Sequence, residues 1–289
     1  MIFHLIFNNL LSGLLLGGVL ALIALGLSIS LGVMRLINLA HGEILIGGAY
    51  AALFLGLAAG FDPLLTLPLV AAFVALVALP LQWLLLAPVS RQGPEAPMMT
   101  TFALSLILQN LYLTWFSADT RSIPAPYAIR PFTLGPISVP LIYLLGFVIS
   151  VAVIAMVYVV VNCSAFGRDL RASALDPVAA ESVGVNVRRV HALTFALGAA
   201  CAAVGGVLIG MTFSFNPTTG SSFLLTSFAV VVLGGMGNIA GTLIAGLALG
   251  LMQSVGALLL GDGFRDLVGL ALFLVVLALR PAGLFVQRA

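Results

Sequence analysis

One short segment of this sequence gathers charged side chains that could dock a partner protein. Between two long apolar regions, seven charged residues lie within 22 positions: Arg168, Asp169, Arg171, Asp176, Glu181, Arg188 and Arg189. No charged residue occurs from Pro131 to Gly167 or from Val190 to Gly261. Charge concentrated in one internal segment of an apolar chain indicates a docking surface, although a solvated loop would have the same composition.

Capping signals predict a short helix inside this charged segment. Asp176 is a good N-cap residue, and Pro177 suits the first helical position. Gly184 can end the helix in the left-handed conformation. The helix expected from Pro177 to Val183 has about two turns, which is too short to be stable alone. We therefore expect the rest of the protein or a partner to hold it.

Two other segments interrupt the apolar pattern and are candidates for lining a pore or gate. Their residues are Asn38, His41, Gly42 and Glu43 in the first, and Gly234, Gly235, Gly237 and Asn238 in the second. Transporters often build their centre from paired, glycine-interrupted helices in two halves of the chain. Whether these segments are equivalent elements of a repeat stays open. For His41 and Glu43, a cytoplasmic turn in which they cap helices is an equal alternative.

The sequence lacks the usual patterns of catalytic and metal sites. Neither H-E-x-x-H nor G-x-S-x-G occurs, and His41 and Glu43 are two residues apart, the wrong spacing for a zinc helix. Cys163 and Cys201 have no companion ligand at metal-binding spacing. The net charge of +2 is too small to indicate nucleic-acid binding. The phosphate-binding pattern G-x-x-x-x-G-K-[ST] is also absent, so we expect no cofactor on this chain.

Composition indicates that the chain lies in a membrane. Of 289 residues, 62% are hydrophobic and 7% are charged, against roughly 25% charged in soluble domains. The apolar runs are continuous, unlike the alternating strands of a membrane β-barrel. The predicted fold class is an all-α polytopic integral membrane protein with eight or nine transmembrane helices. The candidate spans are residues 10–34, 44–60, 64–87, 98–117, 139–162, 191–213, 223–236, 239–261 and 266–280; residues 223–261 could also form one broken element.

Arginines in the loops predict the orientation of the chain. With the charged segment inside, eight arginines lie inside and three, Arg121, Arg130 and Arg265, lie outside, as the positive-inside rule requires. The charged loop, about 163–190, is therefore expected in the cytoplasm. The Pro-rich segment, about 117–139, is expected outside. The whole chain, 1–289, is expected to be one transmembrane domain.

The apolar spans favour energy coupling through a partner. Ionisable residues within a span are costly and are kept mainly where they function, as in ion-coupled carriers. Here the acids are expected at span ends or in loops, with Glu43 the one borderline case. ATP hydrolysis by a docked partner therefore fits better than the alternative, an ion-coupled secondary carrier or channel for small polar solutes. A path without fixed ions should bind solute weakly, so selectivity is expected in a separate receptor.

Motifs along the chain resemble those of branched-chain amino acid permeases of the LivH type. Ala179-Ala180-x-x-x-Gly184 is similar to the core of the EAA loop of bacterial ABC importer permeases, with Val178 where Glu is common. Three further motifs resemble the family in the right order: Ile37-Asn38-Leu39-Ala40-His41-Gly42-Glu43, Phe228 through Gly241, and Arg280-Pro281-Ala282-Gly283-Leu284-Phe285. The resemblance implies an ABC importer permease fold with a cytoplasmic coupling helix that contacts an ATPase. The residues of this coupling helix would be Arg171, Asp176, Pro177, Ala179, Ala180, Glu181 and Gly184.

The resemblance also implies partners and a location. The transporter would contain a LivM-like permease paralogue, two cytoplasmic ABC ATPase subunits and an external or periplasmic solute-binding protein, in the bacterial plasma (inner) membrane. This chain would form part of the translocation path and would not itself be an enzyme. Branched-chain amino acids are the family's usual solutes, but similar chains carry urea, short amides or other small organic acids. A pair of identical permeases is an alternative to the pair of paralogues.

Overall fold

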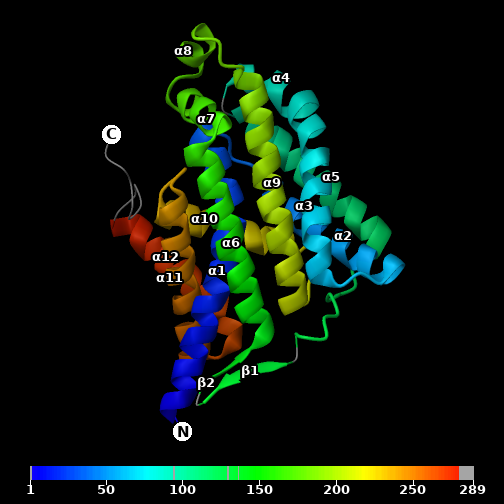
Figure 1. The fold of residues 1–289 in the computed structure, drawn as a ribbon, viewed down its shortest axis with the longest axis vertical. Helices are drawn as coiled ribbons and strands as arrows, with labels where there is room; N and C mark the ends of the chain where they lie inside the picture. The colour runs from blue at the N-terminus through cyan, green and yellow to red at the C-terminus, as the bar shows by residue number, and fades with distance from the viewer. Residues whose placement is uncertain (1, 94, 129, 136, 280–289) are drawn as a thin grey trace.

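Apolar helices make up most of the chain. The computed structural model describes residues 2–93, 95–128, 130–135 and 137–279, so the motif from Arg280 to Phe285 lies outside the described residues. The main helices lie side by side in a bundle (Figure 1). They are α1 (Ile2–Met34), α2 (His41–Ala59), α3 (Pro63–Leu81), α5 (Glu95–Phe116), α6 (Leu141–Cys163), α9 (Val187–Thr212), α10 (Gly220–Gly234), α11 (Ile239–Leu260) and α12 (Arg265–Leu279). The segment 223–261 therefore forms two helices.

Seven helices in the described ranges are long and apolar enough to cross a membrane, which confirms the predicted all-α polytopic fold class. α3 reaches this length because it continues through a π-helical turn, η1 (Gln82–Leu86), into α4 (Ala87–Val89). α10 has 15 residues and is therefore about 22 Å long, which is less than the roughly 30 Å of a bilayer's hydrocarbon core. Other residues must complete its crossing.

α1 and α9 form the centre of the bundle. Both are buried along most of their length. A Cβ atom on Gly26 of α1 would lie 2.3 Å from the carbonyl oxygen of Gly198 on α9, and one on Gly17 would lie 2.7 Å from that of Gly246 on α11. Small residues allow such close helix packing in lipid. α3, α5 and α6 are mostly unburied, so they offer surfaces to lipid or to another subunit.

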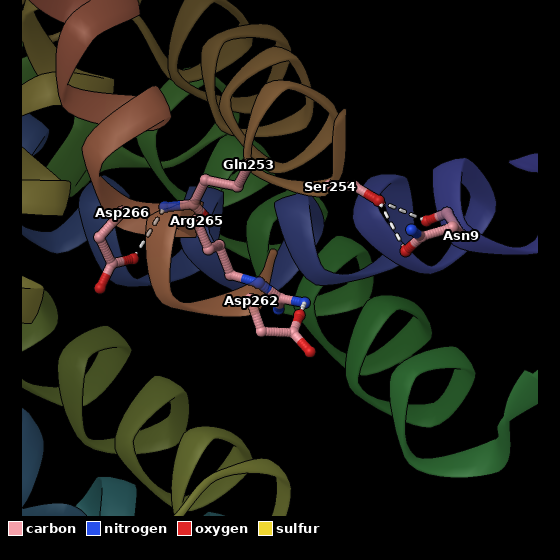
Figure 2. A network of polar contacts seen from close by, with 6 residues as sticks. All are labelled: Asn9, Gln253, Ser254, Asp262, Arg265 and Asp266. Atoms are coloured by element: carbon pink, nitrogen blue, oxygen red, sulfur yellow. Dashed lines mark hydrogen bonds and ion pairs between the residues drawn. The ribbon is translucent and has the colours of Figure 1, made fainter. Parts of the chain in front are cut away.

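Polar contacts join α11 to its neighbours near the N-terminal part of α1 (Figure 2). Ser254 Oγ donates to the backbone oxygen of Asn9 at 2.6 Å and lies 3.1 Å from its Oδ1. Gln253 Nε2 donates to Asp266 Oδ1 on α12 at 3.4 Å. Because polar side chains among apolar helices need partners, these contacts fix how α11 lies against α1 and α12.

The two ends of the bundle carry different elements. α7 (Ala165–Leu175) and α8 (Pro177–Ser182) lie at the upper end in Figure 1. The antiparallel hairpin of β1 (Pro131–Leu134) and β2 (Ile137–Pro140) lies at the lower end, beside the N-terminus. The charged loop and the Pro-rich segment are therefore at opposite ends, as the predicted alternation of spans requires.

The Pro-rich segment is fixed to the ends of the helices beneath it. Arg121 and Phe215 exchange two backbone hydrogen bonds of 2.8 Å, and the Ile123 N–H donates to the carbonyl oxygen of Gly210 at 2.8 Å. Tyr127 donates its hydroxyl proton to Asp62 Oδ1 at 3.0 Å. Burial, and then this hydrogen bond, raise the pKa of Tyr127. The segment is therefore a fixed cover over this end of the bundle.

Candidate functional site

α2 begins inside the bundle. Arg35 adopts a positive φ of 49°, which turns the chain back after α1. His41, the first residue of α2, donates from Nε2 to the carbonyl oxygen of Ile23 at 3.0 Å. Ile23 lies eleven residues before Met34, about 16 Å along the helix at 1.5 Å per residue. Residues 35–40 therefore re-enter the bundle, and α2 starts near its middle depth.

The re-entrant turn satisfies its own backbone groups. Asn38 Oδ1 accepts the N–H of Ala40 at 3.1 Å, and the Asn38 carbonyl accepts the N–H of His41 at 3.3 Å. On α5, Thr101 Oγ1 accepts the N–H of Leu39 at 3.2 Å. Non-helical backbone is tolerated at membrane depth only where protein or a water-filled cavity supplies such partners. Asn38 therefore acts here by shaping the turn.

α10 begins with the same local structure. Asn216 Oδ1 accepts the N–H of Thr218 at 3.0 Å, and the Asn216 carbonyl accepts the N–H of Thr219 at 3.1 Å. In both turns, an asparagine is followed four residues later by a glycine on the first turn of the next helix. The pairs are Asn38 with Gly42, and Asn216 with Gly220. Asn216 and Gly220 are absent from the sequence-based candidates. The recurrence of Asn-x-x-x-Gly after a long apolar helix is the signal that could have identified them.

The units α1–α3 and α9–α11 form an inverted repeat. α1 runs towards the end that carries α8, whereas α9 runs away from it (Figure 1). Each unit contains a long central helix, a re-entrant turn and a helix that starts inside the bundle. α3 packs on α9 and α11 packs on α1, so the third helix of each unit covers the first helix of the other. Inverted-repeat transporters place their central site at the interface between the repeats.

The second glycine-rich candidate segment lies at the far end of α10, in the turn to α11. Its residues are Gly234, Gly235, Gly237 and Asn238, where Gly235 and Gly237 have φ values of 84° and 77° and Asn238 Oδ1 accepts the Gly241 N–H at 3.0 Å. The corresponding turn in the first unit joins α2 to α3, where Gly60 has a φ of 67° and Asp62 caps α3. The two candidate segments are therefore not equivalent repeat elements.

The N-termini of α2 and α10 cross at two glycines. A Cβ atom on Gly42 would lie 2.0 Å from the carbonyl oxygen of Gly220. A Cβ atom on Gly220 would lie 2.5 Å from Glu43 Oε2 and 2.8 Å from the carbonyl carbon of Gly42. No side chain fits at either position unless the helices move apart. The contact therefore joins the two repeat units at the point where both chains enter the bundle.

Glu43 lies at this crossing. Its Oε1 accepts from Ser105 Oγ on α5 at 3.2 Å, and its backbone oxygen accepts from the Tyr112 hydroxyl at 3.2 Å. Oε2 is buried and has no hydrogen-bond partner within the described residues, and the residue as a whole is 3% exposed. The positive ends of two helix dipoles lie beside this carboxyl group. Because Glu43 Oε2 lies beside Gly220, a displacement of α10 would change the surroundings of this carboxyl group.

These positions correct one expectation and specify another. His41 and Glu43 are both buried in the bundle, so they do not form an exposed cytoplasmic turn. Glu43, the borderline case among the acids, is on the first turn of a helix that begins near middle depth, so it lies neither in a loop nor at the end of the bundle. Hydropathy did not reveal this because it counts apolar residues along the chain and contains no information on depth.

The predicted short helix is present in the charged loop as α8. Asp176 Oδ1 accepts the N–H groups of Val178 and Ala179 at 2.9 and 3.1 Å, and Gly184 has a φ of 91°. The helix ends at Ser182, one residue earlier than expected. Three exposed apolar side chains lie on or beside α8: Val178 within it, Leu175 at the end of α7 and Val183 just after it, which are 77%, 83% and 78% exposed.

Two other predicted residues of the coupling helix, Ala180 and Arg171, make contacts within this chain. Ala180 is 3% exposed, and its carbonyl accepts the N–H of Val185 at 3.0 Å, so it faces the protein, whereas Ala179 and Glu181 are exposed. Arg171 donates to the carbonyl oxygen of Val161 near the end of α6 and so fixes α7 to α6. Of the two alanines, only Ala179 is therefore exposed, and the larger exposed apolar side chains of the loop are Leu175, Val178 and Val183.

Comparison with known proteins gives matches over nearly the whole chain. The family described as "Branched-chain amino acid transport system / permease component" matches residues 9–277. The high-affinity branched-chain amino acid transport system permease protein BraD of Pseudomonas aeruginosa is 30% identical over 96% of this chain and 94% of its own length. The protein of the same description called LivH, from Escherichia coli K12, is 29% identical over the same shares.

A sugar permease is also similar over part of the chain. The fructose import permease protein FrcC of Rhizobium meliloti is 35% identical over 42% of this chain and 35% of its own length. Related permeases are thus named for chemically different solutes. Together, the match over residues 9–277 and the seven long apolar helices of the described part show that the chain belongs to the family of branched-chain amino acid transport system permease components.

Proposed function

We propose that this protein is the membrane-spanning permease subunit of an ATP-binding-cassette importer for branched-chain amino acids or a similar small polar solute. The names of its full-length relatives support the solute class. In this proposal it lies in the bacterial inner membrane and pairs with a LivM-like permease. A solute-binding protein delivers the solute at the hairpin end, and two cytoplasmic ATPases bind ATP–Mg and dock at the α8 end.

The observation that carries this proposal is the group of exposed apolar side chains on and beside α8. Leu175, Val178 and Val183 are exposed on a loop that lies outside the membrane-spanning helices. Apolar side chains surrounded by charged ones are typical of a protein interface, in which an apolar centre is surrounded by a polar rim. An ATPase cleft is the partner that an importer of this family would supply. The same loop continues directly into α9, at the centre of the bundle, so a movement of α8 can reach the helices around Gly42 and Gly220.

For the translocation path, we propose that the crossing of α2 and α10 acts as the gate. Ser221 and Ser222, on the first turn of α10, are exposed although that turn begins inside the bundle. Polar groups exposed at membrane depth line a cavity or contact a partner. A second permease would complete the wall on this side. The other side of the gate would be supported by the turn before α2 and its first residues, Asn38, His41, Gly42 and Glu43.

Reconstitution in vesicles tests the proposed function. The complete transporter with its solute-binding protein should accumulate leucine only when ATP is supplied to the ATPase side. Vesicles that contain the permeases without the ATPases should accumulate none, whatever proton or sodium gradient is imposed. Radiolabelled leucine uptake measures both results. Accumulation driven by an ion gradient would reject the importer and favour an ion-coupled carrier.

Glu43→Gln tests the role of the buried carboxyl group at the gate. The amide has the same size, but it replaces a carboxyl oxygen with an NH2 donor and cannot carry a negative charge, which two helix N-termini would stabilise by about 0.3–2 kcal/mol. We expect uptake to fall severalfold while the assembled complex keeps its unfolding temperature within a few degrees. Glu95→Gln is the matched control, because Glu95 is an exposed acid at the start of α5. Equal uptake by the two variants would contradict the role of Glu43.

A further inference from the structure

A second polar site lies behind α8. A cavity of about 420 Å³ opens between η1 and α4 on one side and α8 and the start of α9 on the other. Its polar lining includes Gln82, Ser90, Glu181, Arg188 and His191. Cavities that bind small molecules have volumes of about 300–1,000 Å³ and a few convergent polar groups. The cavity is separate from the crossing of α2 and α10, since none of its lining residues belongs to either helix.

Two buried polar atoms of the lining residues lack partners. Gln82 is 3% exposed, and its Oε1 has no hydrogen bond within the described part of the chain; the same holds for the buried Nε2 of His191. Leaving such groups unpaired costs about 1–3 kcal/mol each. The Gln82 oxygen can only accept, so it requires an N–H or O–H donor. A bound molecule with such a donor would remove this cost.

Gln82 lies where the helix that begins with α3 becomes irregular. Pro80 lies inside α3, and the following residues adopt a π-helical turn in which the Ala87 N–H donates to the Gln82 carbonyl. Pro88 then has no N–H to donate. π-Helical turns in α-helices often occur at functional sites. Here the turn brings Gln82 to the wall of the cavity.

The cavity also contains two opposite charges that do not neutralise each other. Glu181 comes from α8 and Arg188 from the first turn of α9. Among the described residues, neither forms an ion pair. Arginine binds carboxylates through paired, charge-assisted hydrogen bonds. A carboxylate with an ammonium group would complement Arg188 on one side and Glu181 with Gln82 on the other.

We propose that this cavity binds a small zwitterion of the amino acid class. Arg188 binds the carboxylate, and Glu181 and the Gln82 oxygen bind the ammonium group. Such a ligand connects α8 to the helix formed by α3, η1 and α4, whereas α8 otherwise packs on α7 and α9. Occupancy on this side therefore braces the helix proposed to contact the ATPase. The choice of leucine as the probe and the contact of α8 with an ATPase rest on the proposed function, whereas the binding site itself does not.

Direct binding to the assembled transporter tests the site. Radiolabelled leucine is titrated against the full complex in nanodiscs, without the solute-binding protein, for the wild type, Arg188→Gln, Gln82→Leu and Arg189→Gln. We expect saturable binding that weakens about tenfold or more in the first two variants, because each loses a hydrogen bond to a charged ligand group. Arg189→Gln is the matched control, since Arg189 is the next residue, is exposed and does not line the cavity.

Competition with leucine analogues tests the zwitterion. Leucinol, which lacks the carboxylate, and 4-methylpentanoate, which lacks the ammonium group, should each compete at least about tenfold less well than leucine. Absence of saturable binding to a complex that performs ATP-driven uptake would overturn the site and leave the proposed function intact. Equal binding by Arg188→Gln and Arg189→Gln would place the leucine elsewhere, and equal competition by either analogue would reject the zwitterion. ATP-driven uptake by each complex shows that it is assembled.

Discussion

Replacement of Gly42 with alanine is expected to reduce ATP-driven uptake about tenfold or more, because overpacking at a close contact costs about 1–3 kcal/mol. The new Cβ would lie 2.0 Å from the carbonyl oxygen of Gly220 and 2.6 Å from its carbonyl carbon. Both neighbours are backbone atoms, so the helices α2 and α10 must separate. The separation also displaces Glu43. Leucine uptake and thermal unfolding of the assembled complex measure the loss of transport and of stability.

Gly56→Ala is the matched control for this prediction. Gly56 is on the same helix, and the nearest atom to its new Cβ would be the Phe61 oxygen at 3.7 Å, an ordinary contact. Alanine should stabilise that part of α2 by roughly 0.5–1 kcal/mol, so uptake is expected to stay at the wild-type level. Gly220→Ala should reproduce the defect of Gly42→Ala. If Gly42→Ala and Gly56→Ala transport equally well, the close crossing is not required for transport.

Short-range signals account for what the sequence predicted correctly. The helices follow from apolar runs long enough to span a bilayer, and α8 follows from Asp176, Pro177 and Gly184, whose effects act within a few residues. The opposite placement of the charged loop and the Pro-rich segment follows from counting spans. None of these predictions depends on which helices pack against each other.

Tertiary contacts decide what the sequence did not predict. The re-entry before α2 depends on the contact of His41 with Ile23 and on Thr101 of α5, which is 62 residues from Leu39. Ala180 has the small side chain of a docking residue, yet its packing beside Val185 buries it. The pairing of Gly42 with Gly220 joins residues 178 positions apart. The two units of an inverted repeat need few residues in common, because only their turn residues have the same local geometry.

The inverted repeat is not chemically symmetric. At the position after the central glycine, the first unit has Glu43 and the second has Ser221. Glu43 is buried against α5, whereas Ser221 is exposed. One half of the crossing is therefore held by side-chain contacts with Ser105 and Tyr112, and the other half is open to whatever completes the path. We infer that α10 is the helix that moves at the gate and that α2 is the fixed support.

Val178→Asp is expected to uncouple ATP hydrolysis from transport while leaving the permease folded. Val178 is 77% exposed, so the change disturbs little within this chain. In the docked complex it would place an unpaired carboxylate in an apolar contact, which costs several kcal/mol. We expect ATP-driven uptake to fall at least about thirtyfold, the effect of losing a central interface residue worth about 2 kcal/mol or more. Uptake in vesicles and co-purification of the ATPase with the permease measure this effect.

Thr120→Asp is the control for the added charge, because Thr120 is an exposed β-branched residue outside the spans at the hairpin end. Because the solute-binding protein is proposed to deliver solute at this end, co-purification of the ATPase is the readout compared, and Thr120→Asp should keep it in full. Ala180→Asp does not distinguish docking from folding, since Ala180 is buried within this chain, and its loss of activity would follow from a disturbed α8. The decisive comparison is therefore between two exposed positions at opposite ends of the bundle. Wild-type uptake by Val178→Asp would show that the exposed apolar residues at α8 are not the surface through which ATP hydrolysis reaches the permease.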